Sequence, residues 1–127
     1  MRAPLVTAAA GASAVLALHL RDPHAQGSWG LCPFSYLVGL QCPGCGGLRA
    51  VNDLTHLQVG AAVSSNVLAV VFAVVMVLAW TRWAVVRWRG GDAALLSIGP
   101  RAAVAIGVVL VVFTVVRNTP WGAWLAP

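Results

Sequence analysis

Three apolar runs dominate the pattern along this chain. They cover residues 3–20, about 67–86 and 102–116, and only Arg82 places a charge inside one of them. A helix needs about 20 mostly apolar residues to cross the hydrocarbon core of a bilayer. Because lipid offers no hydrogen-bond partners, each run has to pair its backbone groups internally, as a helix does. The pattern predicts an all-α integral membrane protein with three transmembrane helices, at about 3–20, 66–86 and 102–118.

The first run also has the length of a secretory signal peptide, and Arg2 would be its short basic start. No small-x-small cleavage pattern follows Leu20, so we expect this helix to be retained. Its residues from Ala8 to Ala14 are all small, and small residues let membrane helices approach closely. We therefore expect the first helix to pack against the other spans or against a partner chain.

The longest polar segment, residues 21–65, predicts one further short helix. Proline suits the first position of a helix, so Pro43 predicts a helix from 43 to about 57, with Cys42 as its N-cap and Cys45 in its first turn. Positions 45, 49, 52 and 56 would then form a polar stripe opposite an apolar face. A helix of this kind lies at a membrane surface or dips into it. The stripe is Cys45, Arg49, Asn52 and His56, and the simplest expectation for Asn52 and His56 is a solvated position.

Composition agrees with residence in a membrane. The chain has 127 residues, of which 60% are hydrophobic and only 9% are charged, and this predicts a single membrane domain. The net charge of +5 does not indicate a nucleic-acid partner, because the arginines flank apolar runs instead of forming one basic face. The lipid bilayer is the expected partner. So small a unit should also associate with itself or with another membrane protein.

The arginines predict the orientation. Cytoplasmic loops of membrane proteins are enriched in Arg and Lys. The loop at 87–101 and its borders carry Arg82, Arg87, Arg89 and Arg101 against a single Asp92. We therefore expect a multi-pass protein of the cell membrane with a cytoplasmic N-terminus. The 21–65 segment and the C-terminus would lie outside the cytoplasm.

The candidate chemistry lies in the segment from Cys32 to Gly60, which contains all three cysteines. Outside the cytoplasm thiols tend to oxidise, so Cys32 could form a disulfide with Cys42 or Cys45. Alternatively, the three thiolates could bind zinc with His24 or His56 as a fourth ligand. In a third alternative, the C-x-x-C pair Cys42 and Cys45 catalyses thiol–disulfide exchange.

Charged residues of this segment suggest two further sites. Arg49, close to the start of the predicted helix, could bind an anion or a lipid headgroup. Asp53 is a candidate ion-pair partner for Arg117, at the outer end of the third span. The chain has no glutamate, no phosphate loop and no H-E-x-x-H motif, so an ordinary hydrolase or kinase is not expected.

The motifs CPF, CPGCGGLRA, NVLAVV and RN resemble a bacterial membrane family known as domain of unknown function 2752. Two positions depart from the family pattern: Leu48 stands for a threonine, and Val67 stands for a proline that sharpens the start of the second span. The resemblance implies an architecture but no activity. The positions that it carries over are Cys32, Pro33, Phe34, Cys42, Pro43, Gly44, Cys45, Gly46, Arg49, Ala50, Asn66, Arg117 and Asn118.

Taken together, the sequence favours a non-enzymatic accessory or interaction subunit, with the CPGCG element held by a disulfide or a metal. A thiol–disulfide redox protein using Cys42 and Cys45, and a lipid- or anion-binding module at Arg49, remain as alternatives.

Overall fold

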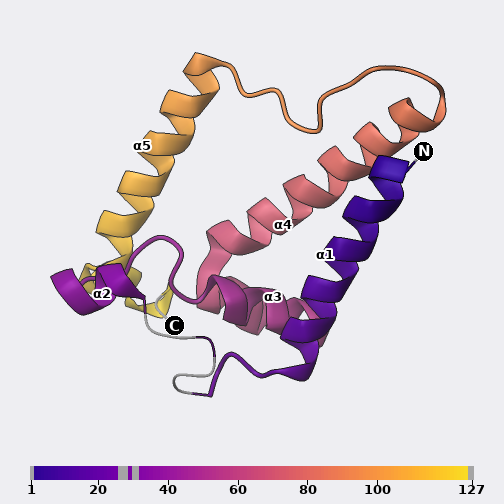
Figure 1. The fold of residues 1–127 in the computed structure, drawn as a ribbon. Coiled ribbons are helices and arrows are strands. Elements are labelled where there is room, and N and C mark those ends of the chain that lie inside the picture. Colours follow the sequence, from indigo (N-terminus) through magenta and orange to yellow (C-terminus); the bar gives the residue numbers. More distant parts are fainter. Residues whose placement is uncertain (1, 26–28, 30–31, 126–127) are drawn as a thin grey trace.

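The computed structural model describes residues 2–25, 29 and 32–125. Three long helices, α1 (Arg2–Leu20), α4 (Val59–Trp88) and α5 (Pro100–Arg117), account for most of the chain (Figure 1). Within the described ranges there is no strand, so the all-α prediction is confirmed. The shorter elements are α2 (Pro33–Val38), α3 (Gly47–Thr55) and the 3-10 helix η1 (Pro120–Leu125).

All three long helices are long and apolar enough to cross a membrane. Only 11% of each apolar window is buried inside the protein, so most of these side chains have no protein neighbour that covers them. A helix that is apolar on all sides needs an apolar surrounding. In a membrane protein the acyl chains supply it, and the prediction of three spans is confirmed.

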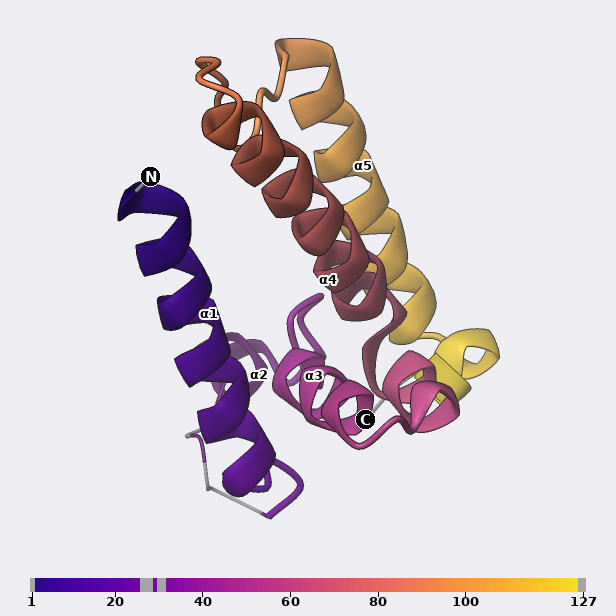
Figure 2. The same ribbon diagram turned by 90° about the vertical axis from the view of Figure 1, so that its right-hand side faces the viewer.

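Contacts between helices concentrate at one end of the molecule. Helix α3 packs against α4 and α1, and η1 packs against α4 and α5. From this end, α4 and α5 diverge toward the linker 89–99 (Figure 1), and α1 runs apart from both in the orthogonal view (Figure 2). At the far end, the Trp80 indole N–H donates to the Thr7 hydroxyl oxygen over 3.0 Å. A Cβ added at Gly11 would meet no described atom within 4 Å, so the small residues of α1 do not make the close helix contact expected within this chain.

Helix α4 changes direction at Asn66, whose φ of −168° and ψ of 99° are extended instead of helical. The Asn66 side-chain oxygen accepts a hydrogen bond from the Ala69 N–H over 3.0 Å. This is the bond that an N-cap makes, and it restarts the helix after the break. Two helical segments, residues 59–65 and 67–88, therefore meet at Asn66.

Candidate metal centre

The sulfurs of the three cysteines lie together. The Cys32 and Cys42 sulfurs are 3.3 Å apart, those of Cys42 and Cys45 are 3.1 Å apart, and all three fall within 4.8 Å of one another. All three cysteines are half-buried free thiols, since a disulfide would need about 2.05 Å between sulfurs. Two sulfurs on one tetrahedral zinc ion lie about 3.8 Å apart, given a Zn–S distance of about 2.3 Å. The cluster therefore has the size of a metal site.

A tight turn presents Cys42 and Cys45. The Cys45 N–H donates to the Cys42 carbonyl over 3.1 Å, and the Gly47 N–H donates to the Gly44 carbonyl over 2.9 Å. Gly46 then takes a left-handed conformation, with φ of 77°, and α3 begins at Gly47. Side chains with a Cβ rarely adopt this conformation, which accounts for a glycine there.

The start of the predicted helix was therefore wrong by four residues. Cys42 is not an N-cap, and Cys45 lies before the helix instead of in its first turn. The left-handed Gly46 prevents the helix from extending back to Pro43. Cys45 therefore lies outside the first turn of α3, the position in which a helix stabilises a thiolate.

Polar side chains from two transmembrane helices hold this turn. The Asn66 amide N–H₂ of α4 donates to the Pro43 carbonyl over 2.8 Å and to the Cys45 carbonyl over 3.0 Å. From α5, the Arg117 Nη1 donates to the Cys42 carbonyl over 3.3 Å. Asn66 is only 1% exposed. The structure thus brings the carried-over positions Asn66 and Arg117 to the backbone of the cysteine turn.

The neighbour of Arg117 extends this support. Asn118 accepts the Gln41 N–H with its side-chain oxygen and donates to the Gln41 carbonyl with its side-chain nitrogen, both over 2.9 Å. The side chain thereby pairs both backbone groups of Gln41, as a neighbouring strand would. In the sequence, Arg117 and Asn118 stood out as a polar pair at the end of an apolar run. Nothing in that pattern indicated that Asn118 would bind the backbone of Gln41.

The thiols of Cys32 and Cys45 differ in acidity. Hydrogen bonds, first from the Ser35 backbone and then from the Cys42 thiol, lower the pKa of Cys32 to about 7. Burial is the main reason that the pKa of Cys45 rises to about 12. The thiolate therefore forms more easily at Cys32 than at Cys45.

Arg117 is buried, with 2% of its surface exposed. Its Nη2 donates to the Ser65 carbonyl over 3.1 Å, and its guanidinium carbon lies 5.4 Å from the centre of the Phe113 ring. In the part of the chain that the structure describes, its Nε finds no hydrogen-bond partner.

The expected ion pair between Asp53 and Arg117 is absent. Asp53 instead faces His24, whose Nε2 lies 3.3 Å from the carboxylate, and accepts the Ser65 hydroxyl over 3.0 Å. Ser65 separates the two charged groups, because its hydroxyl is used by Asp53 and its carbonyl by Arg117.

The polar stripe of α3 faces the end of α1. Asn52 donates from Nδ2 to the Leu18 carbonyl over 2.6 Å, and Arg49 donates from Nε to the Pro23 carbonyl over 3.3 Å. The last carbonyls of a helix lack partners within it, so donors are favourable there. Asn52 is 5% exposed, which corrects the expectation of a solvated position. Anion or lipid binding at the half-buried Arg49 stays a prediction.

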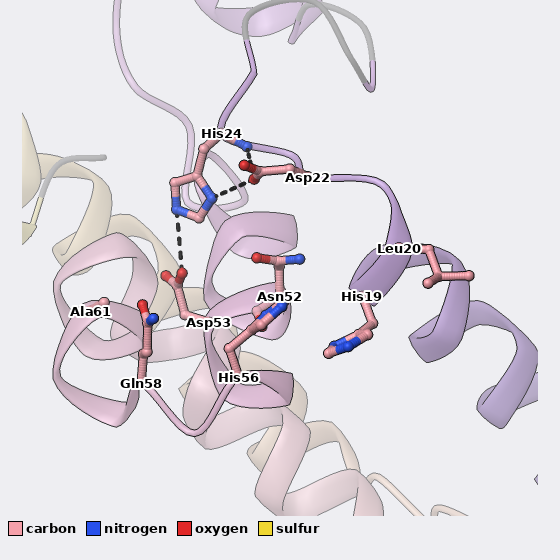
Figure 3. A pocket seen from close by; sticks show the side chains of 9 residues that line it. All are labelled: His19, Leu20, Asp22, His24, Asn52, Asp53, His56, Gln58 and Ala61. Carbon is pink, nitrogen blue, oxygen red and sulfur yellow. Dashed lines mark hydrogen bonds and ion pairs between the residues drawn. The ribbon is translucent and has the colours of Figure 1, made fainter.

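A separate pocket of about 430 Å³ gathers the histidines (Figure 3). His24 lies between two carboxylates, 2.8 Å from Asp22 and 3.3 Å from Asp53, and its backbone N–H is the main reason that the pKa of Asp22 is lowered. The His56 ring stacks on that of His19, with 4.2 Å between ring centres. The structure thus places both candidate ligands His24 and His56 here. Among described residues, the metal-sized cluster contains cysteines alone.

Comparison with known proteins bears on the same segment. No curated protein and no solved structure matches the chain. Residues 32–80 match the family model described as protein of unknown function (DUF2752). This range includes the three cysteines, Arg49 and Asn66, but ends before Arg117. The family resemblance indicated by the cysteine motif is therefore confirmed over residues 32–80, where the chain is similar to this family.

Proposed function

We propose that this chain is a membrane accessory protein whose cysteine turn binds one zinc ion through Cys32, Cys42 and Cys45. The observation that carries the proposal is the approach of three sulfurs to within 4.8 Å of one another. Thiolates are ligands that zinc prefers, and three protein ligands leave a fourth position for water or a partner's side chain. The role is structural: the ion would join the start of α2 to the turn before α3.

An interaction role agrees with the surface around the turn. Helix α2 follows Cys32 directly, and its Tyr36 and Leu37 are each 80% exposed. In η1, Trp121 is 89% exposed. Rings that are polar at one edge are enriched at membrane interfaces and at protein interfaces. We propose that metal binding fixes these side chains for contact with headgroups or with another membrane protein.

The proposal includes an orientation. The positive-inside rule assigns the linker 89–99 and the N-terminus to the cytoplasm, and the cysteine turn and η1 to the other side of a cell membrane. The whole chain then acts as a single membrane domain. Zinc would reach its site from outside the cytoplasm, without crossing the bilayer.

The test is a combined metal and thiol measurement. The protein is purified without reductant and chelator, and zinc is quantified by elemental analysis beside intact mass after alkylation. We expect one zinc per chain and three thiols that react only after chelation. Single Cys→Ser variants should lose the zinc. One free thiol before reduction, with no bound metal, would contradict the proposal.

A second candidate is supported by the central position of Cys42. Its sulfur lies within 3.3 Å of both other sulfurs, so a Cys42–Cys45 disulfide would be within reach of the Cys32 thiolate. Attack of Cys32 on the Cys42 sulfur would form a Cys32–Cys42 disulfide and release the Cys45 thiolate, which takes up a proton. Trapping of both disulfides in one preparation at intermediate redox potential would favour this exchange over a zinc site.

A further inference from the structure

In the part of the chain that the structure describes, no carboxylate pairs with the buried cation of Arg117. The whole chain contains three acidic residues, and all three lie in the described part. Asp22 and Asp53 flank His24, and Asp92 pairs with Arg87 over 3.2 Å. Among described residues, no ion pair joins Arg117 to any of them. A buried charge is costly unless an opposite charge or a set of hydrogen bonds compensates it, and the Arg117 Nε lacks even a hydrogen bond.

One hydrogen bond of Arg117 goes to the backbone of the cysteine turn. The guanidinium donates to the carbonyl of Cys42, a residue whose sulfur is the middle one of the cluster. The Ser65 carbonyl and the Phe113 ring hold the guanidinium from its other sides. The side chains of this turn that can carry negative charge are the cysteines themselves.

The net charge of the cluster differs among the chemistries open to it. Three thiolates around a divalent ion carry −1, which one arginine neutralises. Three thiolates around a monovalent ion such as Cu(I) carry −2. A disulfide with one remaining thiol carries no charge and leaves Arg117 uncompensated. A neutral water as fourth ligand changes none of these sums.

We infer that Arg117 is the charge partner of the loaded cysteine centre and matches it to a divalent metal held by three thiolates. This inference rests on the proposed function and adds the charge of the ion and the residue that balances it. Arg117 is a positioning residue, since its described hydrogen bonds go to carbonyls and not to sulfur. Outer partners of this kind typically change metal affinity by about 10- to 100-fold.

The experiment measures zinc affinity by competition with a chromophoric chelator, on full-length protein in detergent. Arg117→Gln should weaken zinc binding about 10- to 100-fold. Arg117→Lys, which keeps the charge, should stay within a few-fold of the parent. Arg101→Gln, which removes an exposed arginine at the other end of the same helix, should leave the affinity unchanged.

A double-mutant cycle separates charge from simple support of the fold. With Cys32→His, the loaded centre has two thiolates and a neutral imidazole, so its net charge is zero. In that background, Arg117→Gln should no longer weaken zinc binding. An equal weakening in both backgrounds, or a loss with Arg117→Lys as large as with Arg117→Gln, would overturn the inference. A parent protein that binds no zinc would instead overturn the proposed function, and the inference with it.

Discussion

The cysteine turn and the histidine pocket lie at the same end of the molecule but differ in how their charged groups are paired. In the pocket, His24 lies between Asp22 and Asp53, so donors and acceptors are matched within the pocket (Figure 3). The cysteine turn has free thiols, and Asn66 and a buried Arg117 both donate hydrogen bonds to its backbone. Among the described residues, no carboxylate pairs with Arg117, whereas three potential thiolate anions belong to the turn that it contacts. This difference supports the proposal that the cysteine turn binds a metal ion.

Metal removal should separate the two regions most clearly. A ligand present at 1,000 times its dissociation constant stabilises the folded state by about 4 kcal/mol. We expect chelation to lower the thermal stability of the parent protein by a free energy of this order, measured by unfolding in detergent. The Cys45→Ser variant is the control, and its stability should not respond to chelator. An equal response of the variant would show that the chelator acts elsewhere.

Substitution of Asn66 should have the next largest effect. Asn66→Ala removes the donors to two half-buried carbonyls and the cap of the part of α4 that follows Asn66. Each unsatisfied buried group costs about 1–3 kcal/mol, so a loss of about 2–4 kcal/mol is expected. Ser64→Ala, an exposed change on the same helix, should cost much less. Thermal unfolding of the two variants gives the comparison, and similar losses would refute the special role of Asn66.

His24 tests the pocket in the same way. His24→Ala leaves the nearly buried Asp53 carboxylate without its imidazole, while Ser65 still donates to it. We expect a loss of stability of about 1–2 kcal/mol, because one hydrogen-bonded partner is removed from a charged group. Zinc content should be unchanged, since His24 lies outside the sulfur cluster. Loss of zinc in this variant would join the two regions into one site.

Alkylation perturbs the protein least and probes the cysteines singly. With the metal removed, Cys32 has a pKa of about 7, and its thiolate, the reactive form, predominates above that pH. Cys45 has a pKa of about 12 and stays protonated across the same range. Between pH 6 and 8, the alkylation rate of Cys32 should rise and then level off. Peptide mapping by mass spectrometry should find Cys32 labelled before Cys45, and faster labelling of Cys45 would contradict this order.

The sequence was most informative where one physical requirement acts along a continuous segment. The lengths of three apolar runs sufficed to predict α1, α4 and α5, because lipid demands apolar side chains and paired backbone. It was least informative about contacts between distant segments. The targets of Asn52 and Asn118 are carbonyls at the end of α1 and beside Cys42, and no local pattern marks a carbonyl that lacks a partner.

In the cysteine turn, the sequence predicted one feature correctly and another wrongly. The C-P-G-C spacing indicated that Cys42 and Cys45 would lie together, but the same proline suggested a helix that the left-handed Gly46 prevents. The Asp53–Arg117 pair was predicted from charge alone. In the structure Ser65 lies between them, donating its hydroxyl to Asp53 and accepting from Arg117 with its carbonyl. Charge complementarity predicts which groups benefit from pairing, whereas the packing of α3 on α4 determines which of them meet.

The break at Asn66 connects the cysteine turn to the tilt of a transmembrane helix. The same amide that donates to Pro43 and Cys45 also caps the part of α4 that follows Asn66, so a shift of the turn would be transmitted to this helix at the break. At 1.5 Å per residue, the part of α4 after Asn66 is about 33 Å long, and a rotation of about 10° displaces its far end by about 6 Å. A small movement of the three-cysteine turn would therefore become a larger displacement at the far end of α4.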